Sequence, residues 1–328
     1  VAKGWLEGDQ CEFVGDYGSA WDGVGCDDSG RVRALALDGA NLQGTIPEEL
    51  SLLSSIENLI IKNNPDLTGT IPHTIGSALR QLRQLGLDGN NLTGTVPKNI
   101  FRLNHLVYLN LANNALVGTI DWEEIGRHQK KVKRLILHNN MLEGSIEYHM
   151  LAKTQIVLLA LSNNLFSGTI DDTVGTLPAL EYLYLDGNKI VGTIPDGIGY
   201  LVNLRALNLD ENELYGTLPD TLGEMTGLEY LSAKGNTISG GLPDSIKQLT
   251  SLETLNLASN AMSGDLNSLS YMTSLKNVHL YQNSITGPID GAIFTNLMNL
   301  ESLFLSSNLL TGSIPTEVEN AQKQLKGL

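Results

Sequence analysis

The side chains that most often carry catalysis or bind metals are few in this sequence and scattered along it. None of the six histidines is paired with another at the spacing of metal ligands or lies close to a cysteine. They are His73, His105, His128, His138, His149 and His279. The glycine-rich phosphate loop and the G-x-S-x-G nucleophile motif are missing, and no two carboxylates stand out as an acid–base pair. The sequence therefore predicts a protein without enzymatic activity and without a cofactor.

One group of acids recurs at a regular interval. Asp121, Glu147 and Asp171 hold the same place in three successive repeats. In adjacent coils such side chains would lie about 5 Å apart, the spacing of neighbouring strands. Like charges that close repel unless a cation intervenes, and Ca²⁺ prefers oxygen ligands. Two interpretations follow, a weak Ca²⁺ site and a solvated acidic edge, and we favour the second.

The element that must position all of these residues is a repeat. Its clearest copy is LEYLYLDGNKIVGTIP, Leu180 to Pro195, and the pattern L-x-x-L-x-L-x-x-N-x-L-x-G-x-I-P returns from Leu204 to Pro219 and from Leu228 to Pro243. Leu183 and Leu185 are separated by a single residue, so in an extended segment they share one face. One unit cannot bury that face alone, so neighbouring units must stack on it. A fixed period of this length predicts a solenoid.

An asparagine occupies one place in almost every repeat. A buried asparagine needs partners for its carbonyl and its amide. In a stacked coil these partners are backbone groups of its own turn and of the next one, so the side chains form a ladder. The positions are Asn64, Asn90, Asn114, Asn140, Asn164, Asn188, Asn212, Asn236, Asn260, Asn283 and Asn308, with Ala40 in the first unit.

The end of each repeat resembles that of the plant-type leucine-rich repeat family. It reads LQGTIP, LTGTIP, LTGTVP, LYGTLP and LTGSIP, and the resemblance covers twelve units in residues 32–315. It implies an α/β solenoid, a right-handed superhelix or horseshoe, with a parallel β-sheet on the concave face and short 3₁₀ or irregular turns on the convex face. Because the family includes ectodomains of receptor-like proteins and kinases and secreted proteins, it also implies an extracellular binding function.

The same resemblance extends to both ends of the chain. Residues 1–31 are similar to the family's N-terminal cap, although the segment between Cys11 and Trp21 is longer than in the family's pattern. Cys11 and Cys26 are the only cysteines, and we expect them to form a disulfide, which favours an oxidising compartment. Residues 316–328 begin a truncated further repeat or a C-terminal cap, and we expect any membrane span, kinase or wall anchor to follow Leu328.

The residues that the repeat leaves free on the predicted concave face are the candidate ligand contacts. Aromatic side chains gather there in the C-terminal half, with acids among them. They are Tyr182, Tyr184, Asp186, Asn208, Asp210 and Tyr230, followed by His279, Tyr281 and Phe304. Tyrosines beside acids on an open strand face are typical of recognition surfaces. The alternative is that tyrosine favours strands and half-covers the sheet.

A column of hydroxyl side chains marks the place between the glycine and the isoleucine of the repeat end. It contains Thr45, Thr70, Thr95, Thr119, Ser145, Thr169, Thr193, Thr217 and Ser313. A flat ladder of threonines orders water in some ice-binding solenoids, which makes ice binding a remote alternative. The ordinary interpretation is that threonine suits a short strand.

The net charge and the composition limit the classes of partner that this chain is expected to bind. The 328 residues carry a formal net charge of −15, which disfavours nucleic acid and anionic lipid. No apolar run approaches the length of a membrane span, so we expect no direct membrane contact within this segment. Asn91 begins the only N-x-S/T sequon and is a candidate glycosylation site.

These observations predict an extracellular, secreted or cell-surface module. It would bind a peptide, glycan or protein on its concave face, alone or in homo- or hetero-association. A structural or adhesive component of a cell wall or extracellular matrix is the alternative.

Overall fold

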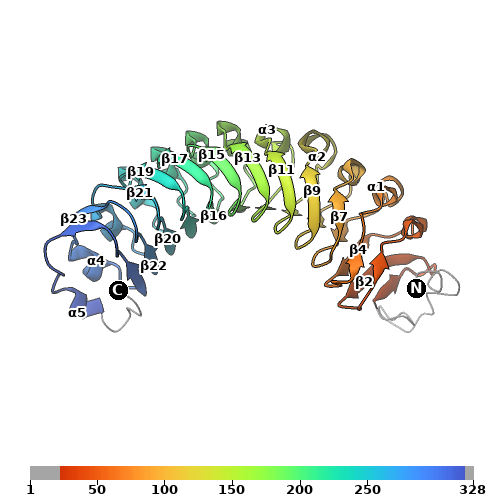
Figure 1. Cartoon of the computed structure of the whole chain (residues 1–328), viewed down its shortest axis with the longest axis horizontal. Coiled ribbons are helices and arrows are strands. Elements are labelled where there is room, and N and C mark those ends of the chain that lie inside the picture. The colour runs from red at the N-terminus through yellow and green to blue at the C-terminus, as the bar shows by residue number, and fades with distance from the viewer. Residues whose placement is uncertain (1–22, 322–328) are drawn as a thin grey trace. The chain divides into compact units, whose positions relative to one another are not determined.

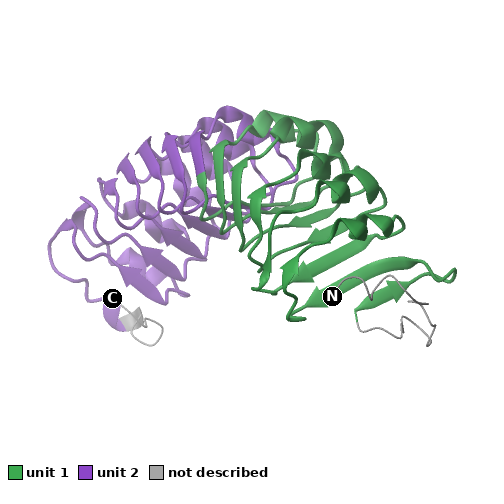
Figure 2. Ribbon diagram, turned by 45° about the vertical axis from the view of Figure 1, so that its right-hand side comes forward, with its two compact units in different colours: residues 1–165 green, residues 166–328 purple. Residues whose placement is uncertain are grey.

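The computed structural model describes residues 23–321. The chain divides into two compact units, residues 1–165 and 166–328 (Figure 2). Cys11 and most of the expected cap lie outside the described residues, as do residues 322–328. The Cys11–Cys26 disulfide and the domain boundaries at residues 31 and 315 therefore stay predictions.

Each unit contains a parallel sheet, here called the main sheet, whose strands are the L-x-L segments of the repeats (Figure 1). In the first unit the strands run in the order β1 (Val24–Cys26), β2 (Val32–Asp38), β4 (Asn58–Lys62), β6 (Gln84–Gly86), β8 (Tyr108–Asn110), β10 (Arg134–Ile136) and β12 (Leu158–Ala160). In the second unit the order is β14 (Tyr182–Tyr184), β16 (Ala206–Asn208), β18 (Tyr230–Ser232), β20 (Thr254–Asn256), β22 (Asn277–His279) and β24 (Ser302–Phe304). Strand β1 pairs antiparallel with β2, so the last residues before the repeats extend the sheet.

A second layer of short strands follows the asparagine of most repeats. In the first unit these are β3 (Gly44–Thr45), β5 (Leu67–Thr68), β7 (Thr93–Thr95), β9 (Ala115–Thr119) and β11 (Met141–Ser145). Strand β13 (Leu165–Thr169) begins at the boundary between the units. The second unit continues with β15 (Lys189–Gly192), β17 (Glu213–Thr217), β19 (Thr237–Gly240), β21 (Ala261–Met262), β23 (Thr286–Pro288) and β25 (Leu309–Thr311). Glycine ends or bends these strands, as Gly192 shows with a φ of +94° and Thr169 Cγ2 only 3.0 Å from where a Cβ would stand.

Short helices close the coils on the side away from the main sheet (Figure 1). In the first unit they are η2 (Glu48–Leu52), α1 (His73–Ala78), η3 (Lys98–Arg102), α2 (Trp122–His128) and α3 (Tyr148–Leu151). In the second they are η4 (Asp172–Thr176), η5 (Asp196–Tyr200), η6 (Asp220–Glu224), η7 (Asp244–Gln248), η8 (Asn267–Tyr271), α4 (Ala292–Asn296) and α5 (Val318–Ala321). The labels η mark 3₁₀ helices, so the prediction of short 3₁₀ turns is confirmed, with α-helical turns in addition.

Three of the α-helical turns lie in the repeats that are longer than the regular step. The steps from Asn64 to Asn90 and from Asn114 to Asn140 are longer than the regular step of the repeat, and they contain α1 and α2. The step that ends at Asn308 is also longer, and it contains α4. Because the main-sheet strands keep their register, the extra residues lie outside those strands, and one of them follows Asn64, where Pro65 and Asp66 precede Leu67.

The leucines of each coil form a continuous apolar core between the layers. Leu183, Leu185, Leu207 and Leu209 are 0% exposed. Fully burying one such side chain contributes about 1.5–3 kcal/mol. The core therefore joins each coil to its neighbours, and the prediction of a leucine-rich repeat solenoid is confirmed within each unit.

The asparagine ladder is present, and its second partner is the preceding coil. The Asn212 Nδ2 donates to the carbonyl of Leu209 in its own coil at 3.2 Å and to that of Leu185 at 3.0 Å. Its Oδ1 accepts from the Ile190 N–H at 3.0 Å. Asn236 repeats the same contacts one coil later, with the Leu209 carbonyl and the Leu214 N–H. Each asparagine thus satisfies backbone groups that the tight turn leaves unpaired.

Candidate binding site

The main sheet of the second unit presents one face to the leucine core and one, here called the open face, away from it. The register across its strands is regular: Tyr182 lies opposite Ala206, and Ala206 opposite Tyr230. Two residues further along each strand, in the next row of paired residues, Tyr184 lies opposite Asn208. Asp186 and Asp210 lie two residues beyond the ends of β14 and β16, where the Gly187 N–H donates to the Asp210 carbonyl at 2.9 Å. The structure therefore brings together, on and just beyond neighbouring strands, six residues that the sequence assigns to one patch. This tyrosine–aspartate patch consists of Tyr182, Tyr184, Asp186, Asn208, Asp210 and Tyr230.

The tyrosines of the patch are half-buried, and two of them are in contact. The rings of Tyr182 and Tyr184 have centroids 6.4 Å apart and an interplanar angle of 32°, a tilted arrangement. Burial raises the pKa of the Tyr184 phenol, and the nearby Tyr182, Tyr230 and Asp186 raise it further. Burial likewise raises the pKa of Tyr230. Both phenols therefore stay protonated at neutral pH and can donate a hydrogen bond to a ligand.

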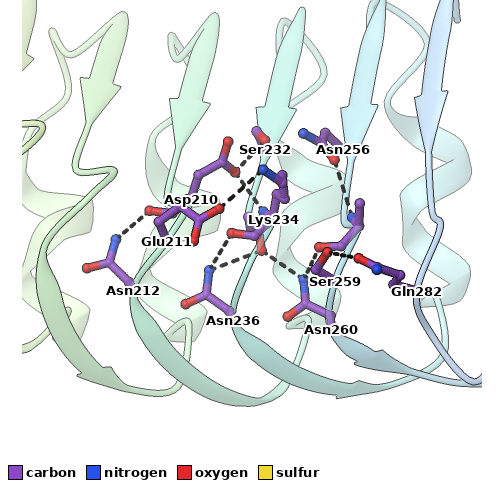
Figure 3. A network of polar contacts seen from close by, with 12 residues as sticks. Asp210, Glu211, Asn212, Ser232, Lys234, Asn236, Asn256, Ser259, Asn260 and Gln282 are labelled. Carbon is purple, nitrogen blue, oxygen red and sulfur yellow. Dashed lines mark hydrogen bonds and ion pairs between the residues drawn. The ribbon is translucent and has the colours of Figure 1, made fainter.

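The Asp210 carboxylate accepts hydrogen bonds that the sequence does not predict. Its Oδ1 accepts a hydrogen bond from Ser232 Oγ at 2.5 Å and one from the Lys234 N–H at 2.6 Å (Figure 3). The Asp210 N–H in turn donates to the Asn208 Oδ1 at 3.1 Å. Burial raises the pKa of Asp210, while the bonds from Ser232 and Lys234 act against that rise. Asp210 thus joins two strands of the open face in addition to lying within the patch.

Sequence reasoning missed the residues that organise this carboxylate. Ser232 is 0% exposed, and the Lys234 Nζ lies 3.2 Å from the Glu211 Oε1. Glu211 has a φ of +50°, which is uncommon for a residue other than glycine. The usable signal was the repeat itself, because Ser232 and Lys234 hold the places of Asn208 and Asp210 in the next unit and so stand on the adjacent strand.

The three remaining candidates lie on later strands of the same sheet. The rings of His279 and Phe304 have centroids 5.0 Å apart, and the His279 Nε2 lies 3.3 Å from the Ser302 Oγ. Burial lowers the pKa of His279, so its neutral form is favoured. Tyr281 follows His279 just beyond the end of β22 and is half-buried. These residues form a second aromatic group, separated from the tyrosine–aspartate patch by strand β20.

Two amide side chains lie on the open face, Asn208 within the tyrosine–aspartate patch and Asn256 on β20, between the patch and the second aromatic group. Asn208 and Asn256 each use the Oδ1 atom to accept a local backbone N–H, from Asp210 at 3.1 Å and from Ala258 at 3.2 Å. Within residues 23–321, the Nδ2 atoms of these two asparagines have no hydrogen-bond acceptor. The open face therefore offers hydrogen-bond donors between its aromatic residues, a combination suited to the carbonyl groups of a ligand.

The proposed acidic edge has a local structural explanation. Asp121 is the N-cap of α2 and accepts from the Glu124 N–H at 2.9 Å, and Asp171 caps η4 through the Thr173 N–H at 2.9 Å. Glu147 stands at the same place before α3 without a side-chain cap. Among residues 23–321, no three histidine, cysteine or acidic side chains gather as a metal site. Asp121 and Asp171 thus replace proline as helix caps, and the Ca²⁺ interpretation stays a prediction.

The hydroxyl column lies on the second layer of strands, where a stagger separates its members. Thr95 lies opposite Val117 and Thr169 opposite Val191, in each case shortly before the next threonine of the column. Each threonine is thus displaced from the next by one strand spacing, about 4.8 Å, and by two residues along the strand, about 6.6 Å. Successive threonines are therefore about 8 Å apart. Its threonines at these strands are exposed, but the column is not the close ladder that the sequence suggests.

Two further predictions concern the surface. Asn91, the candidate glycosylation site, is exposed just before β7, and its glycosylation stays a prediction. Within residues 23–321 we find no helix of the length and apolarity that crossing a bilayer requires.

Comparison with known proteins gives consistent matches. The family model for a leucine-rich repeat region matches residues 156–324, and that for a single leucine-rich repeat matches residues 81–103. A probable leucine-rich repeat receptor-like protein kinase of Arabidopsis thaliana is 34% identical over 68 residues, which are 21% of this chain and 7% of the kinase. The chain thus matches only a small part of that relative's length.

Solved structures resemble nearly the whole chain. The Arabidopsis receptor kinase HAESA, in complex with the peptide hormone IDA and the co-receptor SERK1, has a TM-score of 0.77 and 28% identity. The match covers 99% of this chain and 57% of that one. A plant ice-binding protein has a TM-score of 0.62 and 25% identity, with 90% of this chain and 86% of that one covered. Since the leucine-rich repeat model also matches more than half of the sequence, this chain belongs to the leucine-rich repeat family, in its plant-type form.

Proposed function

We propose that this chain is a non-enzymatic binding module at the cell surface or outside the cell, whose ligand is a peptide or a protein segment. The observation that carries the proposal is the tyrosine–aspartate patch, in which three half-buried tyrosines and two acids share one face of adjacent strands. Tyrosine supplies a large contact area at a low entropic cost. Such aromatic anchors commonly dominate the binding energy of an interface.

The relatives support the same class of function. HAESA is described in complex with a peptide hormone and a co-receptor, and the Arabidopsis relative found by sequence is a receptor-like kinase. For this chain we infer a peptide ligand in preference to a glycan, because the amide groups of Asn208 and Asn256 suit backbone carbonyls. Binding to the open face leaves the second layer and the helices accessible for a protein partner.

Selection from a phage-displayed library of random peptides tests the proposal. We expect the purified chain to enrich peptides whose affinity falls at least tenfold in Tyr184→Ala, since an aromatic hot spot is worth about 2 kcal/mol or more. The matched control is Tyr215→Ala, because Tyr215 is 55% exposed on the second layer, away from the open face. Peptides that lose affinity in Tyr215→Ala but not in Tyr184→Ala would contradict the assignment, and no enrichment would favour the structural or adhesive role.

Ice binding is a second candidate, favoured by the likeness to a plant ice-binding protein over 86% of that protein. The stagger of the hydroxyl column argues against it, because Val117 and Val191 interrupt the threonines. We therefore expect the purified chain not to inhibit ice recrystallisation. Inhibition that disappears in Thr95→Tyr, but persists in Tyr184→Ala, would move the function to the second layer of strands.

A further inference from the structure

We propose that the tyrosine–aspartate patch recognises a cationic side chain, arginine or lysine, of its peptide ligand, with the charged group over the tyrosine rings and beside Asp186. This inference rests on the proposed function and specifies the chemistry of the ligand that the patch prefers. It depends on how the rings and the charges are placed on strands β14, β16 and β18.

The placement of the rings suits a cation. Tyr182 and Tyr230 stand in one row, two strands or about 10 Å apart, and the residue between them is Ala206, which has only a methyl group. Tyr184 stands in the next row, and its ring centroid is 6.4 Å from that of Tyr182. Two rings are therefore in contact, and only a methyl group separates Tyr182 from Tyr230 in their row. The electron-rich face of an aromatic ring attracts an ammonium or guanidinium group within about 6 Å of its centroid.

The acids of the patch and its border outnumber the nearby bases. Asp186, Asp210 and Glu211 bring three negative charges, and Lys234 brings one positive charge. The Lys234 Nζ lies 3.2 Å from the Glu211 Oε1. On the same sheet, Arg205 pairs with two other acids, Glu229 at 2.8 Å and Glu181 at 3.7 Å. The patch therefore keeps an excess of negative charge, which attracts a cationic group and repels an anionic one.

Asp186 lies where the negative charge and the rings meet. Besides the larger effect of burial, the charge of Asp186 raises the pKa of Tyr184, of Tyr230 and of Asp210. Asp186 also continues the alternation of Tyr182 and Tyr184 along the chain, so its side chain faces the same side of the sheet as their rings. Asp210 bonds to Ser232 and to the Lys234 N–H across two strands, so its substitution would disturb the sheet. A cation bound beside Asp186 would contact a carboxylate and aromatic rings together.

The experiment uses peptides selected on the wild-type chain whose binding depends on Tyr184. Each arginine of such a peptide is replaced by citrulline, and each lysine by acetyl-lysine, which removes the charge with little change of shape. We expect one such replacement to raise the Kd about tenfold, as cation–π and ionic contacts together would give. In the Asp186→Asn variant the same replacement should raise the Kd only about two- to fivefold, because the ionic contact is gone and the cation–π contact remains.

The outcomes separate this inference from the proposed function. Peptides that depend on Tyr184 but bind equally well without their charges would overturn the cation preference and leave the proposed function standing. A library that yields no Tyr184-dependent peptide would overturn both. Because the decisive change is made in the peptide, a loss of folding in Asp186→Asn would not obscure the result.

Discussion

At the scale of single residues, two classes of polar side chain play different roles in the same coils. The ladder asparagines point inward and satisfy the backbone, as Asn212 does with groups of two coils. The patch residues lie on the open face and are only half-buried. Asp210 combines both roles, because it belongs to the patch and also bonds to Ser232 and to the Lys234 N–H (Figure 3). Its own N–H donates to the Asn208 Oδ1. Substituting Asp210 would therefore alter the open face as well as its charge.

Asn212→Ala should destabilise the second unit by about 1–3 kcal/mol, because buried backbone groups lose their partners. The Ile190 N–H donates to the Asn212 Oδ1, so hydrogen exchange of the segment around Ile190 should accelerate before that of distant coils. The control is Asn203→Ala, since Asn203 is exposed and its side chain donates to the Pro178 carbonyl at 2.7 Å. Equal effects of the two substitutions on chemical denaturation would contradict the inward assignment.

At the scale of elements, the start of each short helix depends on one residue. In most coils that residue is proline, as at Pro195 before η5, where φ is −76°. In others it is an aspartate that accepts a backbone N–H, as at Asp121 before α2. Glu124 then lies in the first turn and pairs with Arg102 of the preceding helix at 2.9 Å. Two of the three acids that suggest a cation site from the sequence, Asp121 and Asp171, thus stabilise helix starts.

Asp121→Ala should destabilise the first unit by about 1 kcal/mol, the usual cost of losing an N-cap. Glu147→Ala is the matched control, because Glu147 holds the same place before α3 but makes no capping bond. We expect its melting temperature to stay within error of the wild type. If Ca²⁺ raised the melting temperature of the wild type and the two substitutions both removed that effect, the acids would be metal ligands and the capping role would be secondary.

At the scale of the whole molecule, stability is transmitted from coil to coil, because each repeat contacts its neighbours. Mass analysis under non-reducing conditions should find Cys11 linked to Cys26, and two alkylatable thiols would contradict the bridge. Closing that loop contributes about 3 kcal/mol in the chain-entropy model. Reduction should therefore speed hydrogen exchange in β2 and β4 before it affects β16 and β18. A simultaneous loss of protection in all four strands would mean that the repeats unfold as one unit.

The period of the sequence determined the architecture because every coil repeats the same local choices. Leucines at alternate positions, as at Leu183 and Leu185, had to share a face, and an asparagine inside an apolar pattern had to satisfy the backbone. The same period placed Tyr182, Tyr184 and Tyr230 on neighbouring strands, since equivalent positions in stacked coils are neighbours. For this reason the amino-acid sequence was sufficient to assign the members of the patch.

The tertiary structure alone decided the register of the second strands and the hydrogen-bond partners of the polar side chains, because the repeat period encodes neither. The stagger that sets Thr169 opposite Val191 arises from how the second strands pair, and it separates threonines that align in the sequence. The bonds of Asp210 to Ser232, and of Lys234 to Glu211, depend on the directions that these side chains take across two strands. The sequence by itself determined which residues share a face, and the tertiary structure decided how their polar groups are engaged, because that depends on contacts between coils.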